Sequence, residues 1–269
     1  MEDVEQRLSS QDPEERRRAV ADIARLPETE WPGLLVRALG DKNWRVRKEA
    51  VAAARAFVAS PSVLAALVQT LGPGDDVGLR NAAVEALGAF GTLAVGALGA
   101  VMPELDADGR KLAAEALARS GDAAALGVLE AMLEDEPNVR AAAIEAISLV
   151  GTADVDRASA LLERCLVTDD TLVALGALEG LNRLGTAVAW PMLKPHLQNP
   201  VLRDAVLVAA GLSGHPDAAP HLARALATAQ GRSFQSVIGA LATYVANEPA
   251  ARKSARAALG ALGETTRRR

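Results

Sequence analysis

The chain has 269 residues, a net charge of −5 and an apolar half in which alanine and leucine predominate, with three Trp, three Phe and one Tyr. Its one cysteine and three histidines are too few for a Cys/His metal site or a Cys/His nucleophile, which need several such groups together. We therefore expect a protein that is not an enzyme and that has no cofactor.

The charge is unevenly distributed along the chain. Residues 249–269 hold six basic residues and one glutamate, a local +5 that leaves −10 for the remainder, and an acidic body argues against a nucleic-acid binder. Residues 1–11 lack the apolar run of a signal peptide, Cys165 has no partner for an internal disulfide, and no stretch approaches about eighteen uninterrupted apolar residues. These features predict a cytoplasmic protein with no membrane span.

One pattern recurs along the chain. An acid is followed four residues later by arginine, and apolar residues follow this arginine after three, four and seven residues; the clearest copies are 76–87, 106–117 and 136–147. With this arginine as an anchor, the equivalent positions are 16, 47, 80, 110, 140, 174, 203 and 234, spaced 29 to 34 residues apart. Because the apolar spacing is that of one helix face, each anchor is predicted to lie in a helix.

Helix start and stop signals keep the same phase as the anchors. Four residues before each anchor stands a polar side chain that can cap a helix, and proline follows some of these caps. The predicted caps are Asp12, Asn43, Asp76, Asp106, Glu136, Asp170, Asn199 and Gln230, with prolines Pro13, Pro137 and Pro200. Eleven residues after the anchor, where a helix end favours a left-handed residue, stand Gly91, Gly121, Gly151, Gly185 and Gly214.

A further apolar segment lies between each glycine and the next cap, for example at 62–71, 124–133, 156–166 and 218–227. Each unit is therefore a helical hairpin, and residues 1–8 form a shortened first helix, which makes the anchor helices the second helices. Such hairpins cannot bury their apolar faces alone, so they stack. We predict an all-α fold: an α-α superhelix, or right-handed solenoid, of about eight hairpins. It forms a single domain over 1–263, closed by a helix at 248–262, with a short basic disordered tail at 264–269.

The motif Leu79-Arg80, Ala83 and Glu85-Ala86-Leu87 resembles the HEAT repeat, in particular the short phycobilisome (PBS) lyase HEAT-like repeat, over nearly the whole chain. The resemblance implies that anchor arginines bond to acids in the turn of a neighbouring unit, with Asp76, Asp106 and Glu136 as partners. It also implies that the second helices line a concave face. The pattern is broken at Ala174 and Phe234, which replace the anchor arginine.

We predict a scaffold or adaptor that binds another protein or peptide along the concave face of the second helices. A row of glutamates five residues after the anchors would form an acidic stripe there, although glutamate is also simply a good helix former with local partners. The candidate partner-binding residues are Trp44, Arg45, Lys48, Arg55, Glu85, Lys111, Glu115, Arg119, Glu145 and Glu179. Trp44 fits either an exposed binding anchor or a buried wedge between the first two hairpins, and burial is the expectation.

Several alternatives stay open at this point. The lyase-like repeats imply a phycobilin-type chromophore lyase or lyase subunit, and a DNA-binding HEAT-like repair protein is a weaker alternative. His196, His215 and His221 do not have the spacing of a metal motif, and Cys165 is expected to be packed in a helix. The oligomeric state is open, with a monomer expected.

Overall fold

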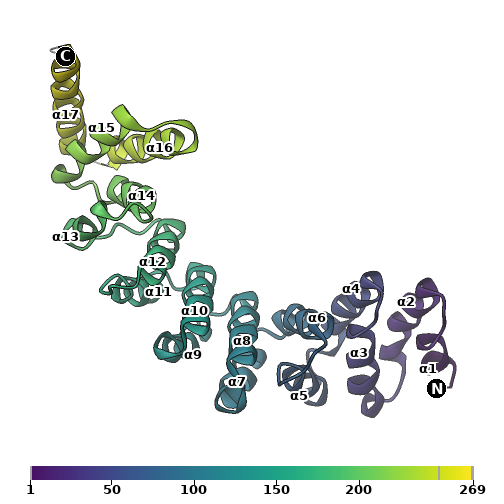
Figure 1. The fold of residues 1–269 in the computed structure, drawn as a ribbon. Coiled ribbons are helices and arrows are strands. Elements are labelled where there is room, and N and C mark those ends of the chain that lie inside the picture. The colour runs from purple at the N-terminus through teal and green to yellow at the C-terminus, as the bar shows by residue number, and fades with distance from the viewer. Residues whose placement is uncertain (1, 248, 268–269) are drawn as a thin grey trace. The chain divides into compact units, whose positions relative to one another are not determined.

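The computed structural model describes residues 2–247 and 249–267, and within these residues the regular structure is entirely helical (Figure 1). The chain forms two compact units, Met1–Ala153 and Asp154–Arg269. The predicted all-α fold of stacked hairpins is confirmed inside each unit. No helix among the described residues is both long enough and apolar enough to cross a bilayer.

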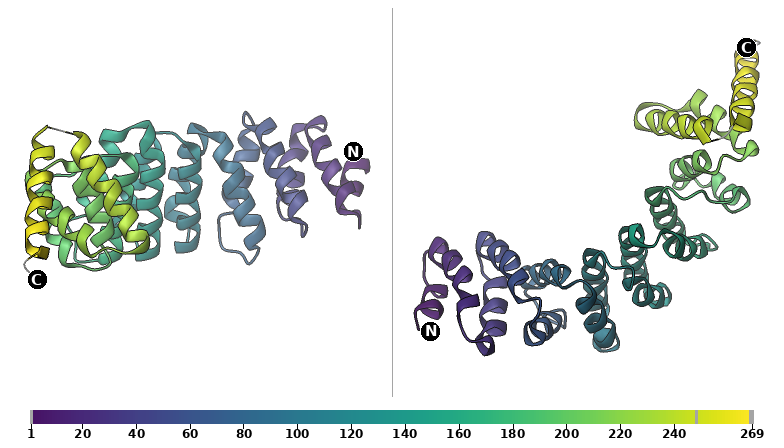
Figure 2. Two further views of the ribbon diagram at one scale, coloured as in Figure 1. Left: turned by 90° about the horizontal axis from the view of Figure 1, so that it is seen from above. Right: turned by 180° about the vertical axis from the view of Figure 1, so that it is seen from behind.

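From residue 2 onward, the first unit consists of five hairpins arranged in two layers (Figures 1 and 2). The first helices form one layer, in which α3, α5, α7 and α9 pack in sequence, and the second helices α2, α4, α6, α8 and α10 form the other. The helices are α1 (Glu2–Leu8), α2 (Pro13–Asp22), α3 (Trp31–Leu39), α4 (Trp44–Ala53), α5 (Pro61–Gln69), α6 (Val77–Leu87), α7 (Thr92–Val101), α8 (Ala107–Ser120), α9 (Ala125–Ala131) and α10 (Pro137–Val150).

Among its described residues, the second unit has three hairpins and one further helix. Its second helices α12, α14 and α16 pack in a row, and α17 packs against both α15 and α16. The helices are α11 (Val155–Arg164), α12 (Thr171–Leu184), α13 (Trp190–Leu193), α14 (Arg203–Ser213), α15 (Ala219–Thr228), α16 (Gly231–Asn247) and α17 (Pro249–Arg267). Since α17 reaches Arg267, residues 264–267 of the expected tail are helical, whereas residues 268–269 lie outside the described residues.

Alanine at the position three residues after the anchor lets the second helices approach closely. Six of these alanines have no exposed surface: Ala19, Ala50, Ala83, Ala113, Ala143 and Ala177. A methyl group fills little space between two helices, so the backbones can lie near each other without strain. The low aromatic content thus reflects a core built from closely spaced helices.

The predicted caps are confirmed at Asp12, Asn43, Asp76, Asp106 and Asp170, whose side chains each accept a hydrogen bond from a backbone N–H in the first helical turn. The prediction is wrong at Asn199 and Pro200, because α14 begins only at Arg203. Asn199 still accepts a bond from the Val201 N–H at 2.9 Å, but this bond forms a turn that precedes the helix.

The predicted glycine stops are left-handed at Gly121, Gly185 and Gly214, and Gly91 also has a positive φ. Gly151 is the exception, with φ −60°, because the chain continues there into the 3-10 turn Gly151–Ala153. A glycine eleven residues after an anchor therefore does not always mark a left-handed helix end.

Gly211 offers a test of the close helix packing. A Cβ atom at Gly211 in α14 would lie 2.4 Å from the carbonyl oxygen of Ala240 in α16. Gly211→Ala should therefore destabilise the protein by about 1–3 kcal/mol through overpacking, seen as a lower midpoint in urea unfolding followed by circular dichroism.

The matched control is Gly239→Ala in α16, where a Cβ atom would meet nothing within 4 Å. Alanine favours helix over glycine by up to about 1 kcal/mol, so this variant should be as stable as the parent or more stable. Equal midpoints for the two variants would contradict close approach at Gly211.

Candidate partner-binding surface

Two anchor arginines, Arg16 and Arg110, each connect neighbouring hairpins of the first unit. Arg16, which is 4% exposed, donates to both carboxylate oxygens of Asp41 at 2.6 and 2.9 Å and to the Ser10 carbonyl at 2.7 Å. Arg110 repeats this arrangement with Asp135, at 2.7 and 2.8 Å, and with the Leu105 carbonyl at 2.8 Å. Each arginine thereby joins its own hairpin turn to the turn of the next hairpin.

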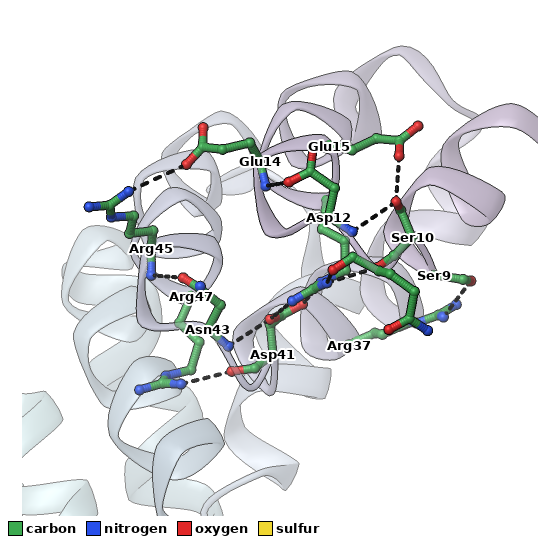
Figure 3. Close-up of polar contacts among 12 residues, drawn as sticks. Ser9, Ser10, Asp12, Glu14, Glu15, Arg37, Asp41, Asn43, Arg45 and Arg47 are labelled. Atoms are coloured by element: carbon green, nitrogen blue, oxygen red, sulfur yellow. Dashed lines mark hydrogen bonds and ion pairs between the residues drawn. The ribbon is translucent and has the colours of Figure 1, made fainter.

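Figure 3 shows the region around the first of these turns, where Arg47 also points at Asp41. The Arg47 guanidinium donates to the Asp41 carbonyl at 2.7 Å, while the Asp41 carboxylate accepts the Asn43 backbone N–H at 2.8 Å. Asp41 therefore receives hydrogen bonds from two successive second helices and from its own turn.

The predicted acid partners are corrected in part. Glu136 accepts from Arg110 at 3.3 Å, and Asp106 lies 3.9 Å from Arg80, so both are secondary contacts. Asp76 instead caps α6 through the Leu79 N–H. The main partners, Asp41 and Asp135, stand two and one residues before their caps. An acid just before the cap was the sequence signal that could have identified them.

These bonds perturb the acids and the arginines in opposite directions. Burial raises the pKa of Asp41, but the hydrogen bonds from Arg16 and from the Asn43 N–H outweigh it, so the pKa falls below the ordinary 3.8. The hydrogen bond from Arg110 lowers the pKa of Asp135 against a smaller effect of burial. The same bonds raise the pKa values of Arg16 and Arg110.

The candidate residues on α4 are exposed on the second-helix layer. Trp44 is 63% exposed, so the expectation that it forms a buried wedge is wrong. Its ring centroid lies 5.7 Å from the guanidinium carbon of Arg45, and Arg45 in turn lies 3.7 Å from Glu14. Lys48 pairs with Glu85 of α6 at 2.8 Å, and Arg55 is exposed in the 3-10 turn that follows α4.

Four further candidates line one groove of about 920 Å³ between α8 and α10: Lys111, Glu115, Arg119 and Glu145. Alanines of both helices also line it, because small side chains leave a depression between two closely packed helices. The groove also includes Asp108 and Leu149, which the sequence reasoning missed. Leu149 is 44% exposed, an apolar side chain on the outward side of α10.

The predicted acidic stripe is interrupted by local pairing. Glu85 is bonded to Lys48, and Glu115 lies 4.0 Å from Lys111 on its own helix, whereas Glu145 is exposed in the groove. Glu179 is exposed on α12 of the second unit. The first unit thus presents a surface of mixed charge.

The histidines have packing roles. His215 and His221 lie against the buried Trp190, with ring centroids 6.3 and 5.4 Å from it, and His196 contacts the Leu166 carbonyl at 3.1 Å. In the part of the chain that the structure describes, no three His, Cys, Asp or Glu side chains gather as metal ligands. Cys165, expected to be packed, is partly exposed at the end of α11.

Helical hairpins stacked in two layers, with arginines bonded into neighbouring turns, define an α-solenoid. A model of HEAT repeats matches residues 1–88 and 95–182, more than half of the chain, so the chain belongs to the HEAT repeat family.

Solved structures with the same fold share little sequence with the chain. An engineered protein is 20% identical with a TM-score of 0.51, over 96% of this chain and 82% of that one. The Escherichia coli protein YibA is 17% identical with a TM-score of 0.53, over 90% and 91% of the two chains. Kap121p bound to Pho4p is 16% identical with a TM-score of 0.54, over 90% of this chain and 33% of Kap121p. No curated protein matches the sequence.

The ion pair of Arg110 and Asp135 should make stability depend on pH in a defined direction. Folding lowers the pKa of Asp135. The carboxylate therefore makes its full contribution to the free energy of unfolding above the ordinary pKa of 3.8, and this contribution is lost as the pH falls through the lower pKa of the folded state. Asp135→Asn should therefore cost about 1–3 kcal/mol at neutral pH, and the difference from the parent should shrink below about pH 4.

Urea unfolding of both proteins at neutral and acidic pH checks this expectation. Glu134→Gln changes an exposed acid next to Asp135 and serves as the control, with little effect at either pH. The same loss of stability for Asp135→Asn at both pH values would show that the charge of the Asp135 carboxylate does not contribute to the stability of the folded protein.

Proposed function

We propose that the chain is a non-catalytic scaffold or adaptor that binds another protein or peptide on the second-helix layer of its first unit. The observation that carries the proposal is the groove between α8 and α10, which combines charged side chains with an exposed leucine. A groove of about 920 Å³ is large enough to receive several side chains of a partner.

The groove favours a partner with basic and apolar residues on one face. Its charged lining comprises Asp108, Glu115 and Glu145 against Lys111 and Arg119, which leaves one net negative charge. Because Lys111 and Glu115 lie near each other, Glu145 and Asp108 are the acids best placed to pair with an incoming lysine or arginine. Leu149 and the alanines would contact the partner's apolar side chains.

Trp44 and Arg45 supply a second set of contacts on the same layer. An exposed tryptophan beside an arginine has the composition of a binding hot spot, and their ring contact holds both side chains together before a partner arrives. The ion pair from Lys48 to Glu85 connects α4 to α6 on this layer. These contacts support binding along several second helices.

Solved relatives support the proposal by analogy of fold. Kap121p, which shares the fold at low identity, has been captured bound to Nup53p and bound to Pho4p. Repeat solenoids generally use extended surfaces for such binding. We further propose that the chain is a cytoplasmic monomer, that residues 1–263 act as one solenoid, and that the binding face is concave. The chromophore-lyase and DNA-repair alternatives stay predictions.

The test is affinity capture from native lysate with quantitative mass spectrometry, using the full chain and a Glu115→Lys, Glu145→Lys variant. The variant reverses the acidic side of the groove, so a partner held there should fall by about tenfold or more. The control is Glu104→Lys, Glu134→Lys, which makes the same charge change on exposed acids that follow first helices α7 and α9.

A partner that is lost from the groove variant and kept by the control would support binding on this layer. Equal loss from both variants would indicate a dependence on net charge alone. Unchanged capture by both would move binding away from the groove, and the absence of any specific partner would contradict the scaffold function.

A further inference from the structure

In each hairpin, one stripe of the second helix faces the following hairpin. The stripe consists of the anchor and the residues four and eight positions later, which share a helix face. The anchors Arg16 and Arg110 bond to acids of the next hairpin. Two residues at the third position of the stripe also contact the next second helix. A Cβ atom at Gly88 would lie 2.8 Å from the Cβ of Arg119 in α8, and the Asn182 side chain donates to the Ala205 carbonyl of α14.

The middle position of this stripe is buried wherever another second helix follows it in the same unit, with Val51 partly exposed as the exception. The buried residues are at most 3% exposed: Val20, Val84, Ala114, Leu178 and Leu207. The middle of the stripe is therefore the part of a second helix that the next second helix covers.

On α16 the same stripe consists of Phe234, Ile238 and Ala242, and all three are exposed. Phe234 and Ile238 are large apolar side chains that are 37% and 42% exposed, and Ile238 occupies the middle position that the other hairpins mostly bury. The anchor here is phenylalanine where earlier anchors are mostly arginine. In the part of the chain that the structure describes, no second helix follows α16.

Helix α17 forms the other border of this uncovered position. It buries Ala251 and Ala255, and it lies against α15 and α16 as a first helix of a further hairpin would. Arg252, Arg256 and Leu259 share another face of α17 and are exposed. The Arg252 guanidinium donates to the Val245 carbonyl at 3.0 Å, which places this face beside the end of α16.

We propose that the edge formed by α16 and α17, defined by Phe234, Ile238, Ala242, Arg252, Arg256 and Leu259, binds an acidic amphipathic helix of another protein. The helix would occupy the position of the next second helix. Its apolar stripe would cover Phe234 and Ile238, and its acidic residues would pair with Arg252 and Arg256. The helix-in-groove mode is a common form of peptide recognition.

Charge decides between this occupant and a second copy of the chain. Two copies meeting at the same edge would bring Arg252 and Arg256 of one against the same residues of the other, since a two-fold contact pairs identical patches. Like charges that face each other are destabilising. An acidic helix meets the same arginines with favourable charge, so the edge favours a different partner.

The test uses the full chain and a fluorescein-labelled designed helix of about 20 residues, long enough to be partly helical alone. The probe has leucines at helical spacing flanked by glutamates, and binding is followed by fluorescence anisotropy. The parent should bind it saturably. Phe234→Glu with Ile238→Glu should weaken binding by about tenfold or more, and Arg252→Glu with Arg256→Glu should weaken it and reduce its dependence on salt.

Two controls isolate the edge. Val167→Glu with Leu172→Glu changes apolar residues that are 83% and 74% exposed elsewhere in the second unit, and it should leave binding unchanged. A probe with lysine in place of each glutamate suits the acidic groove of the first unit instead, so the edge variants should leave any binding of this probe unchanged. Hydrogen exchange with the acidic probe should show protection in 231–247 and in 249–267, which gives a readout that does not depend on the variants.

Three results would overturn the proposal. One is no saturable binding of the acidic helix by the parent. Another is equal binding of the acidic and basic probes, unaffected by the edge variants. The third is a concentration-dependent dimer of the parent, measured by light scattering, that Ile238→Glu abolishes, because this would identify a second copy as the occupant.

Discussion

The bonds from Arg16 and Arg110 into the turn of the next hairpin are the interactions that fix the offset between neighbouring hairpins of the first unit. Apolar contacts between alanine and leucine are non-directional, so they favour stacking without selecting one offset between hairpins. A guanidinium is planar and its donors are fixed, and Arg16 and Arg110 each bind two carboxylate oxygens and one carbonyl. Two turns are thereby held at one spacing. Partial burial makes these bonds stronger than exposed ion pairs and makes the loss of either partner costly.

The same small residues that allow this stacking also shape the surface. Alanines such as Ala113 and Ala143 are fully buried between helices, while Ala118 and Ala142 line the groove between α8 and α10. Larger side chains at the latter positions would fill the depression, and larger ones at the former would separate the helices. An alanine-rich composition therefore serves both the core and a groove that a partner's side chains can enter.

The sequence predicts the periodic features well because each has a local physical cause. An aspartate that accepts an N–H in the first turn, as Asp106 does from Gly109, acts within four residues. The predictions fail where tertiary contacts decide. Residues 199–202 form a turn, so the start of α14 moves to Arg203. Trp44 is exposed because the burial of a tryptophan depends on neighbouring helices that sequence spacing cannot position. The candidates Lys111, Glu115, Arg119 and Glu145 line one groove because residues at equivalent positions of successive repeats lie on the same side of the stacked helices. The ion pair between Lys48 and Glu85 depends on the distance between α4 and α6, which the sequence does not give.

The two proposed surfaces select partners of opposite charge, and this difference bears on what an adaptor needs. The lining of the groove in the first unit carries one net negative charge and favours a basic partner, whereas the edge of α16 and α17 presents Arg252 and Arg256 and favours an acidic helix. A ligand suited to one surface meets like charges at the other, so the surfaces do not compete for the same ligand. Each surface also lies within a single unit and is built from that unit's own helices. Binding at one proposed surface therefore requires no residue of the other, and the two proposals can be tested independently.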